Sequence, residues 1–234
     1  MNDLQAAFVQ AFLLIVGLDE SLTEIICLSL QVSLMAVLLA SLIGLPLGAG
    51  LALARFPGRR LAVVMVNALM GLPPVVVGLL VYLLLSRSGP FGEWGLLFTP
   101  TAMTIAQCVL VTPIVAALTR QVVEDLWLEL EEQLRSLDVG PWQAMGTLLW
   151  EGRFSLLTAI LAGLGRAIAE VGAVIIVGGN IAHVTRTMTT AIALETSKGD
   201  LPLALGLGII LIALAVLINL AVYLAKDAAQ RWQI

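Results

Sequence analysis

The feature that most constrains this sequence is a set of long stretches that contain no Asp, Glu, Lys or Arg. Four of them are 25 to 30 residues long: Ile25–Ala54, Leu61–Ser86, Trp94–Thr119 and Leu201–Ala225. A helix needs about 20 apolar residues to cross the roughly 30 Å of hydrocarbon in a bilayer. The stretches are apolar on every face and do not alternate, which argues against strands. Each is therefore predicted to be a membrane-spanning helix.

One more span, the fourth of five along the chain, is predicted over Phe154–Val177, although this stretch contains Arg166 and Glu170. The composition agrees with a chain that lies mostly in lipid, since 60% of its residues are apolar and 12% are charged. Soluble domains carry about 25% charged residues. The net charge is −4, whereas a nucleic-acid-binding protein usually has an excess of basic residues. We expect an all-α membrane protein with five transmembrane helices in a single domain, 1–234.

The sequence offers little material for catalysis or metal binding. Cys27 and Cys108 lie in apolar runs, where cysteine usually serves as a small buried hydrophobe, and His183 is the one histidine. No cluster has the ligand spacing of a zinc or haem site. We expect no bound metal and no catalytic residues, which argues against a membrane enzyme.

The N-terminal segment 1–20 is predicted to be a helix that lies in the membrane interface. Leu4, Phe8, Phe12 and Ile15 share one helical face, as in an interfacial amphipathic helix. The segment begins without the positive charges of a secretory signal. A sixth, short span is the alternative, because about 15 apolar residues are marginal for crossing a bilayer.

Lysine and arginine predict the orientation, because they accumulate on the cytoplasmic side of membrane proteins. With five spans, eight of them share one side: Arg55, Arg59, Arg60, Arg120, Arg135, Arg153, Lys226 and Arg231. The other side has three: Arg87, Arg186 and Lys198. The C-terminus is therefore expected in the cytoplasm and the N-terminus outside.

The second span is interrupted by Gly71-Leu72-Pro73-Pro74. Proline lacks an amide hydrogen and disfavours helix in the residue before it. A break at membrane depth needs neighbouring protein or a water-filled cavity to satisfy the freed backbone groups. Pro73 and Pro74 therefore mark either a packing kink or a break that lines a pathway. No matching interrupted span is evident in the other half of the sequence.

The connection 119–153 is the one long segment on the predicted cytoplasmic side. It is rich in helix-forming acidic residues, and Leu130, Leu134 and Leu137 recur at helical spacing. Gly140 suits the end of a short amphipathic helix, and Pro141 suits the first position of the next one. This helix either covers the membrane face or docks a cytosolic partner, with the leucines as anchors.

A resemblance to bacterial ABC importer permeases rests on the string Glu131-Glu132-Gln133-Leu134-Arg135-Ser136-Leu137-Asp138-Val139-Gly140-Pro141-Trp142. It is similar to the EAA loop of that family, roughly E-x-A-R-S-L-G-x-x-P-W, a coupling helix that docks on the ATP-binding subunit. Two alanines are replaced, and Asp138 stands where the family has glycine. Aspartate is among the few residues that tolerate a left-handed turn, so the turn is expected to survive. The resemblance assigns ATPase coupling to Glu131, Glu132, Leu134, Arg135, Ser136, Leu137, Asp138, Pro141 and Trp142.

A second resemblance is to the R-A-x-x-E-F/V-G-A segment of the sulfate, molybdate and tungstate permeases, matched by Arg166–Ala173. The following string up to Asp200 is similar to the tungstate branch. Hydroxyl donors suit an oxyanion, which offers only acceptors, although a plain solvated loop is the alternative. The pathway or gate is expected to include Pro73, Pro74, Arg166, Glu170, Gly172, Asn180, Thr187, Thr189 and Thr190.

Arg166 and Glu170 are expected to lie near the middle of the membrane, four residues apart on one helical face. Ionised residues at that depth are costly and are usually paired or functional. One interpretation is an ion pair that fixes how the spans pack. The other is that Arg166 offers positive potential to a dianion. A tightly paired arginine binds anions poorly, which favours architecture with weak steering.

These resemblances imply a type I (MetI-like) ABC importer permease of a prokaryotic plasma (inner) membrane, acting by alternating access. No phosphate-binding G-x-x-x-x-G-K-[ST] loop is present, so ATP and Mg²⁺ are expected on an ATP-binding partner and no cofactor in this chain. Further expected partners are an extracytoplasmic substrate-binding protein and a second copy of the chain. Tungstate is the favoured cargo, with molybdate or sulfate as alternatives. A stand-alone anion channel or secondary carrier is the rival of a different class.

Overall fold

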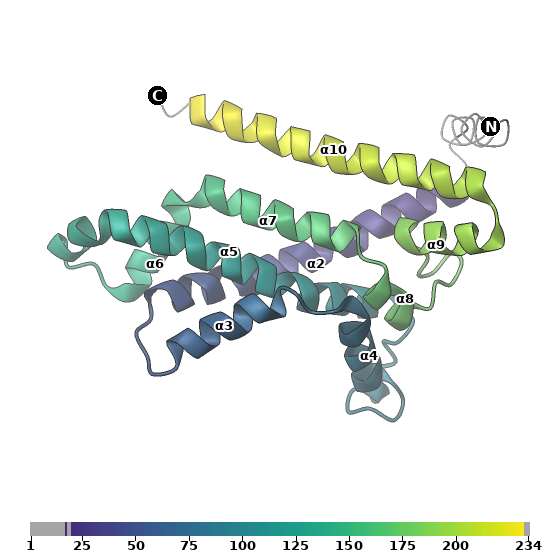
Figure 1. Ribbon diagram of the computed structural model, residues 1–234, viewed down its shortest axis with the longest axis horizontal. Coiled ribbons are helices and arrows are strands. Elements are labelled where there is room, and N and C mark those ends of the chain that lie inside the picture. Colours follow the sequence, from purple (N-terminus) through teal and green to yellow (C-terminus); the bar gives the residue numbers. More distant parts are fainter. Residues whose placement is uncertain (1–16, 18–19, 232–234) are drawn as a thin grey trace.

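The computed structural model describes residue 17 and residues 20–231 (Figure 1). Within these residues the chain is helical and has no strand, so the prediction of an all-α fold is confirmed. The helices are α2 (Glu20–Leu53), α3 (Arg59–Leu69), α4 (Pro74–Leu85), the short η1 (Gly92–Trp94), α5 (Pro100–Ser136), α6 (Pro141–Glu151), α7 (Arg153–Ile168), α8 (Gly172–Gly178), α9 (Met188–Lys198) and α10 (Leu201–Arg231). The predicted interfacial helix over 1–20 lies almost wholly outside the described residues.

The centre of the molecule is the crossing of α2 and α5. Gly44 and Gly48, four residues apart on α2, let the two backbones approach closely. A Cβ atom on Gly48 would lie 2.3 Å from the carbonyl oxygen of Ala116, so only glycine fits there. Helix α5 begins at Thr99, whose hydroxyl accepts a hydrogen bond from the amide of Ala102, and then runs for 37 residues.

Among the described residues, three helices are long and apolar enough to cross a membrane: α2 from Leu22, α5, and α10 as far as Leu224. Two pairs pass the same test only as bent pairs, α3 with α4 at 100° and α6 with α7 at 76°, which allows up to five spans. The predicted count of five therefore stays a prediction.

The fourth span was expected to be one helix over Phe154–Val177, and that expectation is wrong. Helix α7 ends at Ile168, and α8 begins at Gly172. The predicted fourth span is therefore interrupted, as the second one is. The second break contains no proline, and for that reason the sequence did not reveal it.

The two breaks meet inside the protein, because α4 packs against α8. A Cβ atom on Gly78 of α4 would lie 2.8 Å from the Cα atom of Ala173 of α8. Gly172 at the start of α8 lies in turn against Val75. The amide of Phe98 donates to the carbonyl of Val177 at 2.9 Å and joins α8 to the start of α5. These contacts unite α4, α8 and the start of α5 in one tightly packed unit.

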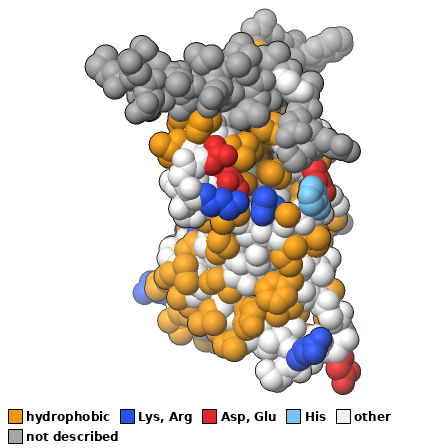
Figure 2. Space-filling view, turned by 90° about the vertical axis from the view of Figure 1, so that its right-hand side faces the viewer, with side chains coloured by type: hydrophobic (Ala, Val, Ile, Leu, Met, Phe, Trp, Pro, Cys, Tyr) orange, Lys and Arg blue, Asp and Glu red, His pale blue; other side chains and the backbone are white. Residues whose placement is uncertain are grey.

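The helices leave two differently built ends (Figure 1). One end, here called the basic end, carries the connection 54–58, the turn 137–140 and α6. The opposite end carries the connections 86–99 and 179–187 and helix α9. Figure 2 looks onto this opposite end, where charged side chains gather in a narrow band above a broad apolar surface.

Candidate functional site

The basic end is organised around the turn that closes α5. The amide of Asp138 donates to the carbonyl of Arg135, and the amide of Val139 donates to that of Leu134. Asp138 has a φ of 53°, so the left-handed turn predicted for this aspartate is present. Leu134 and Val139 pack together in the same apolar cluster, as expected for this kind of helix ending. The turn therefore fixes the direction in which α6 leaves α5.

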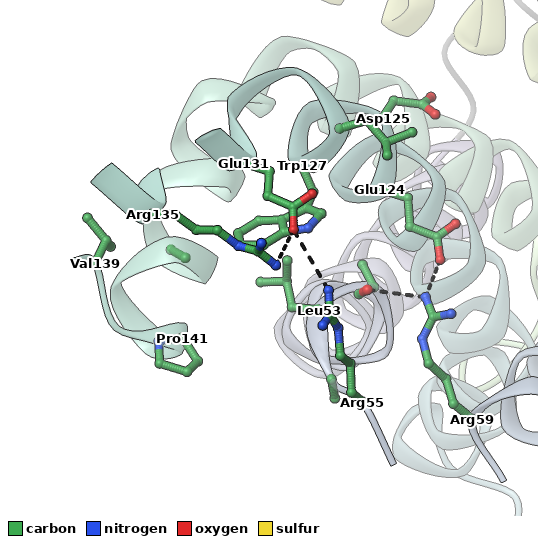
Figure 3. A pocket seen from close by; sticks show the side chains of 14 residues that line it. Leu53, Arg55, Arg59, Glu124, Asp125, Trp127, Glu131, Arg135, Val139 and Pro141 are labelled. Atoms are coloured by element: carbon green, nitrogen blue, oxygen red, sulfur yellow. Dashed lines mark hydrogen bonds and ion pairs between the residues drawn. The ribbon is translucent and has the colours of Figure 1, made fainter. Parts of the chain in front are cut away.

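Two glutamates of α5 bind the connection between α2 and α3 (Figure 3). Glu124 forms ion pairs with Arg59 and Arg120. Arg59 also donates to the last carbonyl groups of α2, at 2.8 Å to Leu51 and 3.1 Å to Ala52. Glu131 pairs with Arg135 at 2.5 Å and with Arg55 at 3.7 Å. Glu131 thus helps to hold the basic end together, and its coupling role stays a prediction.

These side chains surround an open hollow of about 640 Å³ between the end of α2 and helices α5 and α6. Trp127 and Pro141 form part of its wall, and Arg55, Arg135 and Glu131 converge on it (Figure 3). The three arginines and three acids that line it balance one another. The hollow therefore has no net charge that would favour one sign of ligand.

The predicted coupling residues separate into an inner and an outer group. Leu134 is 8% exposed and packs inward, so it supports the turn and cannot anchor a partner in a groove. Leu137 is 73% exposed and Trp142 is 81% exposed. Also exposed are Glu132, Arg135, Ser136, Asp138 and Pro141. The expected separate amphipathic helix is absent here, since the segment consists of the end of α5, a turn and the start of α6.

The break between α7 and α8 is built around Glu170. Its side chain is 2% exposed and forms an ion pair with Arg166, which is 29% exposed. The other carboxylate oxygen accepts from the amide of Ala173 at 2.9 Å and so caps α8. Thr189 of α9 donates to the carbonyl of Glu170 at 2.8 Å. These contacts favour the first of the two interpretations, an ion pair that fixes how the helices pack.

The threonines of the predicted pathway are buried and bonded to the protein itself. Thr187 caps α9 and shares hydrogen bonds with Thr189 and Thr190 at 3.3 and 3.1 Å. Asn180, at a φ of 50°, donates to the carbonyl of Thr190 at 3.3 Å. In this conformation these groups make an internal network rather than an open row of donors, so they stay pathway candidates only.

The other predicted pathway residues lie at the two breaks. Pro73 is exposed and precedes α4, and Pro74 is the first residue of that helix. Gly172 lies close to both Val75 and Pro74. The structure thus brings together Pro74 and Gly172, which the sequence placed in separate spans.

Three polar residues at the same place were missed by the sequence analysis. Ser29 and Ser33 of α2 and Gln107 of α5 are buried beside Glu170 and the threonines. A signal was available, because Gln107 is a strongly polar side chain inside an uncharged apolar span, and the two serines share a helical face. Within the described part of the chain, no group of three or more His, Cys, Asp or Glu could hold a metal ion.

The long apolar helices describe a helical protein built to cross a membrane several times. The chain belongs to the family described as "Binding-protein-dependent transport system inner membrane component", whose pattern matches residues 44–233. It is therefore a multi-pass inner membrane protein and a member of the ABC importer permeases.

Individual relatives agree with this family. The tungstate uptake system permease protein TupB of Peptoclostridium acidaminophilum is 39% identical over 227 residues, which is 97% of this chain and 100% of that protein. TupB of Campylobacter jejuni subsp. jejuni is 39% identical over 219 residues, 94% of this chain and 92% of that protein. The sulfate transport system permease protein CysW of Synechocystis sp. is 31% identical over 215 residues, 89% of this chain and 78% of that protein.

Proposed function

We propose that this chain is the permease subunit of a tungstate importer driven by ATP. The observation that supports tungstate as the cargo is the 39% identity to two tungstate uptake permeases over nearly the whole chain. The sulfate permease relative is less similar, at 31% identity. Sulfate and tungstate are tetrahedral dianions with the same acceptor chemistry, so sulfate is the second candidate.

The proposal places the basic end in the cytoplasm and the opposite end outside. Six arginines support it: Arg55, Arg59, Arg60, Arg135 and Arg153 belong to the connections of the basic end or to helix ends beside it, and Arg120 of α5 shares Glu124 with Arg59. Lysine and arginine are enriched on the cytoplasmic side. The C-terminus would then lie in the cytoplasm and the N-terminus outside.

The proposed partner at the basic end is an ATP-binding subunit, which docks on the turn that follows α5. Leu137 and Trp142 supply exposed apolar area there, and Glu132 and Ser136 supply polar contacts. Exposed aromatic and apolar residues surrounded by polar ones are typical of interface centres. ATP and Mg²⁺ would bind that subunit, and this chain would need no cofactor. An external binding protein and a second copy of the chain complete the proposed importer.

Docking is tested by co-purification of the ATP-binding subunit with the double variant Leu137→Asp/Trp142→Ala. We expect at least a tenfold loss of the copurified subunit, because removal of interface anchors typically costs about 2 kcal/mol or more. The matched control is Trp94→Ala, which removes a 65% exposed tryptophan at the opposite end. Unchanged recovery of the subunit with the double variant would refute the docking site.

Cargo is tested by tungsten, molybdenum and sulfur accumulation in cells with and without the chain, measured by mass spectrometry. The binding protein is supplied in both cases, and each case is measured with and without the ATP-binding subunit. Tungsten uptake that requires the chain and resists excess molybdate supports the proposal. If only sulfate uptake is lost without the chain, sulfate is the cargo instead of tungstate. Uptake that persists without the ATP-binding subunit would favour a stand-alone carrier.

A further inference from the structure

Four segments of the chain meet at a small polar cavity beside the break between α7 and α8. The cavity lies among Ser29 and Ser33 of α2, Gln107 of α5, Glu170 at the break, and Thr187 and Thr189 at the start of α9. Its volume is about 10 Å³. A cavity of roughly this size holds one water molecule.

The hydrogen bonds around the cavity leave one strong acceptor without a partner. Gln107, which is 3% exposed, donates from Nε2 to the carbonyl of Ala167 at 3.0 Å. Its other amide atom, Oε1, is buried and accepts no hydrogen bond within the described residues. Ser33 is also 3% exposed, and its hydroxyl forms no hydrogen bond with the residues that the structure describes. A buried polar atom usually has a partner, so an unpartnered amide oxygen on a residue that lines a polar cavity points to a ligand.

The chemistry of the walls decides what that ligand is. An oxyanion is excluded by size, and the Glu170 carboxylate in the wall would repel it. A metal cation would find oxygen atoms, but Arg166 already neutralises Glu170, so the cation would be a buried net charge. A neutral molecule that donates to Gln107 Oε1 and accepts from the Ser33 hydroxyl meets both demands, and water does so with two to four bonds.

We propose that this cavity binds one water molecule, which donates a hydrogen bond to Gln107 Oε1. The water thereby holds Gln107 in the position where it links α5 to the end of α7, and this link is here called the joint. This proposal rests on the proposed function, because its consequence is a coupling step of the importer. Helix α5 runs from Pro100 to Ser136 with Pro113 inside it, and so it joins Gln107 to the turn at the basic end. The 29 residues between Gln107 and Ser136 span about 43 Å at 1.5 Å per residue.

The position of Gln107 gives the joint its role. A displacement of the turn by the ATP-binding subunit would pass along α5, and Gln107 would transfer that motion to the carbonyl of Ala167, at the end of α7. Since Glu170 and Thr189 continue from that point to α8 and α9, the joint would link the cytoplasmic motion to the outer helices. Gln107 is thus a positioning residue, and it need not touch the transported ion.

The first test uses the complete importer with its binding protein in proteoliposomes and compares the wild type with Gln107→Leu. We expect Gln107→Leu to hydrolyse ATP but to transport about tenfold less tungstate per ATP, the factor that follows when a joint weakens by about 1.4 kcal/mol. Thr104→Val, which removes a hydroxyl that donates only to Pro100 on the same helix, is the control. An unchanged ratio of tungstate to ATP in Gln107→Leu would overturn the proposal.

The second test separates the water from the glutamine. Ser33→Val leaves Gln107 in place and fills the cavity, so it should displace the water and reproduce the loss of coupling. Ser41→Val is the matched control, because Ser41 lies on the same helix, is 9% exposed and has an unpartnered hydroxyl away from this cavity. Equal effects of the two serine variants would overturn the water site. Ser33→Val also decides the question if Gln107→Leu fails to reach the membrane.

A high-resolution cryo-EM map provides a direct readout. Density for one water between Gln107 Oε1 and Ser33 in the wild type, lost in Ser33→Val, supports the proposal, and a dry cavity in the wild type refutes it. Failure of the proposed function is recognised separately, because the wild-type importer would then accumulate no tungstate while the density could still be present.

Discussion

The break between α3 and α4 and the break between α7 and α8 differ in what holds them. The first break is satisfied by nearby backbone, since the amides of Gly71 and Leu72 donate to carbonyls three residues earlier. Pro73 and Pro74 have no amide hydrogen, so they need no acceptor there. The second break has a similar backbone bond, from the amide of Glu170 to the carbonyl of Ala167, but two other elements add to it. Gln107 of α5 and Thr189 of α9 donate to its carbonyls.

This difference separates a bend encoded in the local sequence from one encoded by tertiary contacts. A bend with prolines keeps its backbone restrictions even when its neighbours change. A bend held by a buried carboxylate fails when that carboxylate is removed, because a charge and an amide group then lose their partners together. The second break should therefore be much more sensitive to single substitutions than the first.

The largest expected effect is that of Glu170→Ala at the second break. The substitution leaves Arg166 without its ion-pair partner and uncaps the amide of Ala173. We expect the free energy of unfolding to fall by about 3 kcal/mol, the lower end for broken buried pairs, because Arg166 retains some access to solvent. Denaturation in mixed micelles measures it.

The conservative variant Glu170→Gln is the control for that experiment. It keeps an oxygen that can accept from Ala173 and removes the negative charge, so its cost should be distinctly smaller, about 2 kcal/mol. Equal costs for the two variants would mean that the ion pair alone holds the break. Negligible costs for both would contradict the architectural role of Glu170.

A second prediction concerns the contact that joins the two breaks. Gly78→Ala places a Cβ atom 2.8 Å from the Cα atom of Ala173, which neither backbone can avoid without moving. We expect a loss of about 2 kcal/mol, as in other overpacked sites, measured by the same denaturation experiment. Gly165→Ala on α7 is the matched control, because its Cβ would meet no atom within 4 Å. If Gly78→Ala and Gly165→Ala lower the stability equally, α4 and α8 can move apart at their contact without a large cost.

The same contrast explains how much of the fold and the site could be predicted from the sequence. The apolar runs predicted the continuous spans, and Gly71–Pro74 predicted the first break, because each signal lies in adjacent residues. The second break was missed, since its determinants come from α5 and α9, far along the chain. The Asp138 turn was anticipated because aspartate tolerates a left-handed φ, whereas the burial of Leu134 depends on α6 and Val139 and could not be inferred from helical spacing alone.

A third prediction tests the turn at Asp138, which is also encoded locally. Asp138→Val places a β-branched residue at a φ of 53°, where the left-handed conformation costs about 1–2 kcal/mol. We expect a modest loss of stability and weaker copurification of the ATP-binding subunit. Asp138→Gly, which suits this conformation, should retain both. If the glycine variant loses the subunit as well, the carboxylate itself contributes to docking.

The smallest effect is expected for Pro73→Ala/Pro74→Ala at the first break. Alanine can adopt the φ of −64° found at Pro73, and Pro74 occupies the first helical position, where proline only restricts the unfolded chain. We expect a loss of about 1 kcal/mol for the pair of substitutions, with the 100° bend retained because the contact of Gly78 with Ala173 still holds α4. Distances between spin labels on α3 and α4 measure the bend directly. A straightened span in this variant would show that the prolines, and not the packing of α4 on α8, impose the bend, and the contrast between the two breaks would then be sharper than the contacts alone indicate.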